Sequence, residues 1–197
     1  MIRYQYLPEL VIEHRCKKIM EVGVWNGGTA NHMISAAVSV DDRADNVYYY
    51  GFDLFDEFVV NEDTGDVKIP PPIDDVWNMV NVPGTIADLI KGDSRETVPN
   101  FVENYTDKMD MIFIDGGHGE DVIEADWNNV QPLIDKNTVV VFDDYWLPEH
   151  GWGCNKAVSE LDRDVWNVEV MPKTDSIRWK NKDYSLGVVK VMIKDKL

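Results

Sequence analysis

Short apolar runs alternate with amphipathic stretches along most of this chain, and that alternation limits its fold more than any other feature. Residues 18–24 form a short, mostly apolar run that leads into a glycine turn, as a buried parallel strand does. The stretch after the turn carries apolar residues at the spacing of one helix face: Ala30, Met33, Ile34, Ala37 and Val38. Strands that alternate with helices build a parallel sheet covered on both faces. The sequence therefore predicts an α/β fold.

The same alternation continues toward the C-terminus. Further strands are predicted at 47–53, 86–91, 109–115 and 138–142, and further helices at 96–105, 123–134 and 154–161. Two late strands, at about 165–171 and 185–193, have no helix between them, so we expect them to pair antiparallel. Residues 54–84 contain four prolines and many acids, and we interpret them as an insertion outside the sheet. At 197 residues, the chain is long enough for one domain, predicted to span 1–197.

The charge balance narrows the class of partner. With 19 basic and 36 acidic side chains, the formal net charge is -17, and such a surface repels phosphate backbones and anionic lipids. We therefore expect neither a nucleic acid nor a membrane partner, and no stretch reaches the roughly 18 apolar residues of a membrane span. The N-terminal residues do not resemble a signal peptide. Cys16 and Cys154 are interpreted as free or buried thiols, which indicates a cytoplasmic protein.

The first predicted strand and helix are joined by a glycine turn at residues 21–29. Such a turn lets a ligand approach the backbone N–H groups at a helix N-terminus. A dinucleotide-binding turn would need glycine at position 25, where the backbone touches the pyrophosphate, and this chain has Trp25. The sequence therefore favours a ligand without a pyrophosphate, and a dinucleotide oxidoreductase is disfavoured.

Acids follow the next two predicted strands. Asp53 ends the second strand, where it can accept bonds from ribose hydroxyls, and Asp93 and Ser94 follow the third, where they can contact an adenine edge. The alternative for each acid is a helix N-cap or a solvated loop. Their positions at successive strand ends beside a glycine turn favour a nucleoside site.

These motifs resemble those of class I S-adenosylmethionine-dependent methyltransferases. The resemblance extends from about residue 17 to the C-terminus and implies a Rossmann-like three-layer sandwich with a mostly parallel seven-stranded sheet and a reversed last strand. It implies S-adenosylmethionine as the cofactor, with the turn at the methionine end, Asp53 on the ribose, and Asp93 and Ser94 beside adenine. Trp25 departs from the small residue that many members carry. The candidate cofactor-binding residues are Glu21, Gly23, Asn26, Gly27, Gly28, Thr29, Asp53, Asp93, Ser94 and Asp115.

Three further acids lie at the ends of two other predicted strands. Asp115 ends one strand, and Asp143 and Asp144 end the next, about one strand–helix–strand unit later. Neighbouring parallel strands lie about 4.8 Å apart, so these carboxylates can converge at one sheet edge. Carboxylates that close repel one another unless they are protonated or bridged by a cation, and oxygen ligands suit Mg²⁺, Mn²⁺ or Ca²⁺. The alternative is that Asp143 caps a loop and His118 is a surface histidine.

The segments IDGGH, ending at His118, and FDDY, containing Asp143 and Asp144, resemble the macrocin O-methyltransferase group of sugar O-methyltransferases. That resemblance implies a divalent metal, such as Mg²⁺, on Asp115, Asp143 and Asp144. It also implies that His118 serves as the base, and Asp115 and His118 are the candidate catalytic residues. In the implied reaction the metal lowers the pKa of an acceptor hydroxyl, His118 removes the proton, and the oxygen attacks the sulfonium methyl.

The acceptor and some alternatives stay open at this stage. The negative charge favours a neutral or cationic small molecule, such as a saccharide, as the hydroxyl acceptor. Proteins of the cephalosporin hydroxylase type have a similar glycine turn and similar strand-end acids, so another reaction on the same fold is an alternative, as is a non-catalytic cofactor-binding protein. His150, Trp146 and Trp152 follow the acid pair and could line a substrate pocket or simply pack there. The oligomeric state stays open, a homo-oligomer included.

Overall fold

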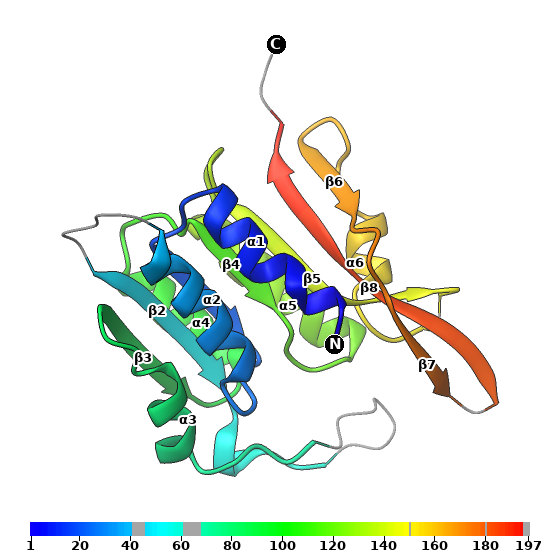
Figure 1. Cartoon of the computed structure of the whole chain (residues 1–197). Coiled ribbons are helices and arrows are strands. Elements are labelled where there is room, and N and C mark those ends of the chain that lie inside the picture. The colour runs from blue at the N-terminus through cyan, green and yellow to red at the C-terminus, as the bar shows by residue number, and fades with distance from the viewer. Residues whose placement is uncertain (41–45, 61–67, 150, 180, 195–197) are drawn as a thin grey trace.

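The structure is a computed structural model that describes residues 1–40, 46–60, 68–149, 151–179 and 181–194 (Figure 1). Its sheet has the strand order β3-β2-β1-β4-β5-β8-β6, with β7 pairing with β8. The strands are β1 (Lys18–Val22), β2 (Val47–Asp53), β3 (Thr85–Lys91), β4 (Met111–Ile114), β5 (Val139–Leu147), β6 (Trp166–Val170), β7 (Asp175–Trp179) and β8 (Lys182–Ile193). The first five are parallel, and β8 runs antiparallel to both β5 and β6. The predicted α/β fold and its reversed last strand are confirmed.

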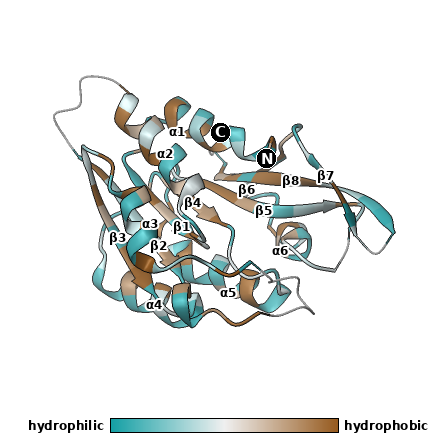
Figure 2. Cartoon of the chain, turned by 60° about the horizontal axis from the view of Figure 1, so that its bottom comes forward, coloured by the Kyte–Doolittle hydropathy of each residue, from teal (hydrophilic) through white to brown (hydrophobic). Residues whose placement is uncertain are grey.

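Helices cover both faces of this sheet (Figure 2). One layer contains α1 (Tyr6–Glu13), α2 (Gly28–Ser39) and α3 (Ile73–Val80), and the other contains α4 (Ser94–Asn104), α5 (Glu120–Val130) and α6 (Asn155–Ser159). Single 3-10 turns occur at η1 (Arg3–Gln5), η2 (Phe55–Glu57) and η3 (Gln131–Leu133). Among the described residues, no helix has the length and apolar character that crossing a bilayer requires.

Alternation along the central strands divides the core into two parts. On β4, Met111 and Phe113 pack toward the layer of α1 and α2, whereas Ile112 and Ile114 pack toward α4 and α5. All four side chains are buried, as the apolar run 109–115 predicts for a parallel strand covered on both sides. Cys16 and Cys154 are free and buried, which confirms the interpretation of the two thiols.

Three elements were not predicted from the sequence. Helix α1 is short and follows the 3-10 turn η1, β7 is a five-residue strand that pairs with β8, and α3 lies inside the predicted insertion. The described parts of residues 54–84 contain no strand, and their interpretation as an insertion stays a prediction. Helix α3 is nevertheless well packed, because Val76 and Val80 are fully buried.

Candidate active site

A bulge in β5 determines where two of the predicted acids point. The parallel ladder between β4 and β5 ends at Phe142, and β5 continues beyond it along β8. Phe142 pairs with Val189 and Tyr145 with Gly187, so two residues of β5 oppose one residue of β8. Asp144, within this bulge, has a positive φ of 54°. The bulge breaks the normal alternation and allows Asp143 and Asp144 to reach the same site.

The three predicted acids come together at this sheet edge. One carboxylate oxygen from each of Asp115, Asp143 and Asp144 lies within 4.8 Å of the other two. His118 joins them, because its Nε2 lies 2.9 Å from Oδ2 of Asp144. All four residues line one open cavity, together with Ile114, Gly116, Gly117, Ile123 and Cys154. We call Asp115, Asp143 and Asp144 the acid cluster.

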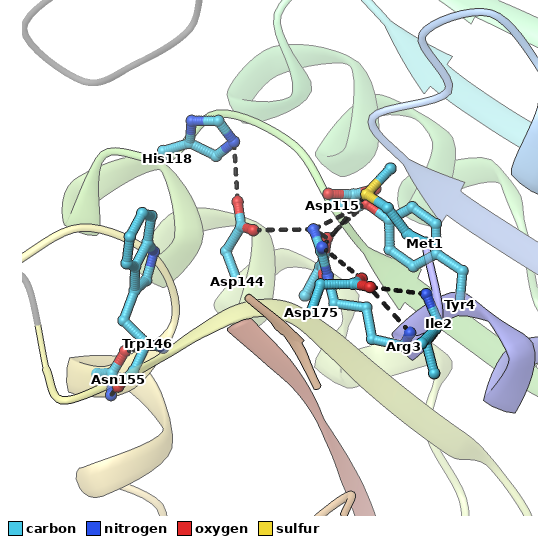
Figure 3. Close-up of polar contacts among 11 residues, drawn as sticks. Met1, Ile2, Arg3, Tyr4, Asp115, His118, Asp144, Trp146, Asn155 and Asp175 are labelled. Carbon is cyan, nitrogen blue, oxygen red and sulfur yellow. Dashed lines mark hydrogen bonds and ion pairs between the residues drawn. The ribbon is translucent and has the colours of Figure 1, made fainter. Parts of the chain in front are cut away.

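Arg3 from the N-terminal segment is bonded directly to this acid cluster (Figure 3). Its Nε and Nη2 donate to the two oxygens of Asp143 at 2.7 and 2.8 Å, and Nη2 also lies 3.3 Å from Oδ1 of Asp144. Its Nη1 donates to Asp175 on β7 at 3.0 Å. The Arg3 residue is only 5% exposed, so this is a buried network of one cation and three carboxylates.

Tyr4 adds a second contact to the acid cluster. Its hydroxyl lies 2.6 Å from Oδ2 of Asp143 and 3.1 Å from Oδ2 of Asp115. Arg3 and Tyr4 were not identified from the sequence, and no local signal could have found them, because their partners lie more than 100 residues away. An arginine beside a tyrosine near a chain end is an ordinary pair until the fold places carboxylates around it.

The three acids differ in their electrostatic surroundings. Burial, together with the charges of Asp143 and Asp144, raises the pKa of Asp115 well above its ordinary value. Burial also tends to raise the pKa of Asp144, but the hydrogen bond from His118 and the charge of Arg3 outweigh it and hold that pKa below its ordinary value. Asp144 is therefore the ionised partner of His118.

The glycine turn lies directly beside the acid cluster. A Cβ atom on Gly23 would lie 1.9 Å from the backbone oxygen of Asp115, and Gly23 has a φ of +91°. Only glycine fits this contact, so β1 and β4 are closely apposed where both strands end. Gly27 precedes α2 with a φ of 75°, and the side chain of Asn26 accepts a bond from the N–H of Gly28 at 3.0 Å. The turn and the acid cluster thus form one continuous region.

Asp53 connects the second strand to this turn. One carboxylate oxygen accepts the N–H of Trp25 at 2.7 Å, and the other accepts the N–H of Phe55 at 2.9 Å. Trp25 is 39% exposed, and its indole N–H lies 3.4 Å from the carbonyl of Ile69 in the insertion. The side chain of Lys68 lies over the same ring. The insertion therefore contacts the turn from outside.

The remaining predicted cofactor residues lie at different depths. Glu21 is fully buried and accepts a hydrogen bond from Tyr49, and burial raises its pKa to about 8 despite that bond. Asp93 caps α4, accepting the N–H of Arg95 at 2.9 Å, and its bonds with the Arg95 side chain lower its pKa. Ser94 begins α4, and Thr29 lies in the first turn of α2. The alternative of an N-cap is thus realised for Asp93, and its contact with adenine stays a prediction.

The aromatic residues after the acid pair pack together. Trp146 is buried, makes edge contacts with Trp152 and Tyr184, and has its backbone bonded on both sides by the Asn155 amide (Figure 3). This arrangement agrees with the alternative in which Trp146 packs rather than binds a substrate. His150 lies outside the described residues.

The acid cluster has the donor set that a divalent cation requires. Its oxygens are close enough to be bridged, and three carboxylates without a counter-ion would repel one another. Arg3 supplies one positive charge there. The residues therefore fit a cation, but the guanidinium already contacts two of the three acids.

Comparisons with known proteins agree with this geometry. The family described as "Methyltransferase domain" matches residues 20–145, and no curated protein matches the chain by sequence. The fold is similar to the O-methyltransferase TomG from Streptomyces achromogenes, solved in complex with SAM, with a TM-score of 0.63 and 13% identity over 98% of this chain and 79% of that one.

Two further solved structures have a similar fold. The calicheamicin methyltransferase CalS11, described in a second structure as a TDP-rhamnose 3'-O-methyltransferase, has a TM-score of 0.63 and 21% identity over 93% of this chain and 76% of its own. The O-methyltransferase NovP has a TM-score of 0.62 and 18% identity over 94% of this chain and 78% of its own. None of these matches tests membership of the macrocin group. The family match covers most of the chain, and the chain therefore belongs to the methyltransferase domain family, as a class I S-adenosylmethionine-dependent methyltransferase.

Proposed function

We propose that this protein transfers a methyl group from S-adenosylmethionine to a hydroxyl oxygen of a small molecule, with His118 as the general base. The observation that carries the proposal is the 2.9 Å contact between Nε2 of His118 and Asp144, on the wall of the cavity that Asp115 and Asp143 also line. A carboxylate bonded to one ring nitrogen orients the imidazole and stabilises its protonated form. This is the arrangement that removing a hydroxyl proton requires.

For the cofactor, we propose that the glycine turn holds the methionine end and that Asp53 binds the ribose. Gly23 and Gly27 give the turn its positive φ angles, and α2 begins at Gly28, where backbone N–H groups can meet a ligand. The Asp53 oxygens each accept one backbone bond and have further lone pairs for the ribose hydroxyls. Asn26 and Thr29 would contribute from the same turn, with Glu21 below it and Asp93 and Ser94 beside adenine.

A saccharide is the acceptor class we propose. The support is indirect: CalS11, of similar fold, is described as acting on TDP-rhamnose, and the formal charge of -17 disfavours polyanionic acceptors. The two free thiols support a cytoplasmic location.

We also propose divalent-metal assistance, by Mg²⁺ or a similar ion, with Asp115, Asp143 and Asp144 as the ligands. When bound, such an ion would polarise the acceptor hydroxyl and lower its pKa. His118 would then take the proton, held in place by Asp144. Asp115, next to the Gly23 turn, would keep the acceptor side adjacent to the methyl donor.

The test uses purified enzyme with a donor carrying a labelled methyl group and a panel of sugars and sugar nucleotides. We expect labelled product with at least one saccharide, and a turnover lowered by roughly 10²–10⁴-fold in His118→Ala, the usual contribution of a general base. Calorimetry should give nearly the same cofactor affinity for both proteins. The matched control is His32→Ala on α2, which should leave turnover unchanged. Normal turnover of His118→Ala would remove this histidine from the mechanism.

A further inference from the structure

The N-terminal segment Met1–Tyr4 supplies a positive charge to the acid cluster, the guanidinium of Arg3 (Figure 3). Any other cation that binds there would meet this charge. Both oxygens of Asp143 are bonded by Arg3, and Oδ2 is shared with the hydroxyl of Tyr4. Asp144 is likewise engaged at both oxygens, by Arg3 at Oδ1 and by His118 at Oδ2. Every carboxylate oxygen of the acid pair therefore has a partner from the protein itself.

A divalent ion bonds carboxylate oxygens at about 2.0–2.6 Å. An ion at that distance from Asp143 or Asp144 would stand close to a guanidinium that lies 2.7–3.3 Å from the same oxygens. Both cations would be largely shielded from water, because Arg3 is 5% exposed and the two acids 3% and 8%. Like charges that close in a buried place repel strongly. The guanidinium at Asp143 and Asp144 therefore opposes the binding of a divalent ion to the same two carboxylates.

We propose that Arg3 is a resident counter-ion that competes with a divalent cation for the acid cluster and so sets the affinity of this site for metal. The inference rests on the cation site of the proposed function and names the residue that controls its occupancy. A cation binds when Arg3 leaves, and Arg3 returns when the cation is lost.

The anchors of Arg3 indicate which part of the chain would move. Asp175 accepts the N–H of Ile2 at 2.8 Å and the guanidinium of Arg3 at 3.0 Å, so β7 holds the segment from outside the acid cluster. The segment precedes α1, which is tied into the core by fully buried side chains such as Leu7 and Val11. Release is therefore expected for Met1–Tyr4, with α1 staying in place.

The first experiment measures Mn²⁺ binding by the loss of the free-ion electron paramagnetic resonance signal. Arg3→Met replaces the arginine by an unbranched side chain without a charge. We expect this variant to bind Mn²⁺ at least tenfold more tightly than the wild type. Arg3→Lys, which keeps the charge, should stay near the wild type. The double variant Arg3→Met with Asp143→Asn should lose the gain, which would locate the ion at the acid cluster.

A second variant and a second measurement test the proposal even if Arg3→Met does not fold. Asp175→Asn leaves Arg3 and the acid cluster intact but weakens the anchor, so it should bind Mn²⁺ several-fold more tightly than the wild type. In the wild type, saturating Mn²⁺ should speed amide hydrogen exchange in peptides covering residues 1–5, and exchange in β4 should not change.

The outcomes separate the two proposals. Equal Mn²⁺ affinity in the wild type, Arg3→Met and Asp175→Asn, abolished by Asp143→Asn, would overturn the competition and leave the cation site standing. No Mn²⁺ binding by any folded variant would overturn both the competition and metal assistance. Methyl transfer by His118 would be untouched by either result, because labelled-product formation tests it separately.

Discussion

The glycine turn and the acid cluster adjoin each other, yet the chain builds them in different ways. The turn is made from neighbouring pieces: its bonds join Trp25 to Asp53, 28 residues away, and Gly28 to Asn26, two residues away. The acid cluster depends on contacts across the whole chain, since Arg3 reaches Asp143 over 140 residues and Asp175 over 172. The hydrogen bonds of the turn therefore need only β1, α2 and β2, whereas the acid cluster also needs β4, β5 and the N-terminal segment.

Two further acids, Glu21 and Asp126, are fully buried near these regions. Under the turn, Glu21 accepts a hydrogen bond from Tyr49. Asp126 on α5 is fully buried near Asp93 and Ser94, and among the described residues neither of its oxygens has a hydrogen bond of good geometry. A Cβ on Gly116 would lie 3.1 Å from one of these oxygens, so Asp126 supports the loop that carries His118. Oε1 of Glu21 likewise has no hydrogen-bond partner among the described residues, so each of these buried acids has at least one oxygen without a partner.

The largest effect of a substitution is expected where the two regions touch, at the contact between Gly23 and the carbonyl of Asp115. Gly23→Ala would force a Cβ to within 1.9 Å of the Asp115 carbonyl at a positive φ, and we expect it to lower the free energy of unfolding by about 3 kcal/mol or more. Calorimetry should also detect at least tenfold weaker cofactor binding. Gly117→Ala is the control, because its Cβ would meet only Val122 at ordinary contact distances of 3.4–3.8 Å. Similar stability of the two variants would contradict the close apposition.

Asp126 gives the stability of the folded protein a predicted pH dependence. Burial raises the pKa of Asp126 to about 7, although Ser94 partly offsets this effect. In an unfolded chain, the pKa of an aspartate is about 3.9. Between these values the folded protein holds a proton that the unfolded chain has lost, so the contribution of Asp126 to stability falls as the pH rises from about 4 to about 7. Asp126→Asn carries no such charge, so its stability relative to the wild type should rise by a few kcal/mol over that range and then level off.

The measurement is urea unfolding of both proteins at several pH values between 4 and 9. A difference between them that does not change with pH would show that Asp126 is ionised or satisfied in the folded protein.

The smallest expected effect on stability is predicted for Tyr49, below the glycine turn. Tyr49→Phe removes the only hydrogen bond found for the Glu21 carboxyl among the described residues, and we expect a loss of about 1–3 kcal/mol in the free energy of unfolding. Cofactor affinity should fall far less than in Gly23→Ala, because the bond lies below the turn. Tyr48→Phe, the neighbouring half-buried tyrosine, should change stability by less than about 0.5 kcal/mol. A large loss of affinity in Tyr49→Phe would instead give Glu21 a direct part in cofactor binding.

Local patterns were enough to predict the order of strands and helices. The apolar runs identified all of the sheet strands except β7, and the absence of a helix between the last predicted strands correctly indicated antiparallel pairing. Strand ends also predicted that Asp115, Asp143 and Asp144 would converge, since parallel strands end at a common sheet edge. Helix α3 escaped prediction because prolines and acids surround its short apolar stripe.

The sequence by itself determined the class of fold, the glycine turn and the meeting of the three acids, because each follows from periodicity or from a strand end. Only the tertiary structure decided which charges neutralise those acids. The bulge that turns Asp143 and Asp144 to one side comes from their register against β8, and the pairing of Arg3 with them comes from the path of the N-terminal segment past β7. Side-chain partners separated by more than 100 residues leave no local pattern, because the contact is created when the sheet closes and water is removed from the charges.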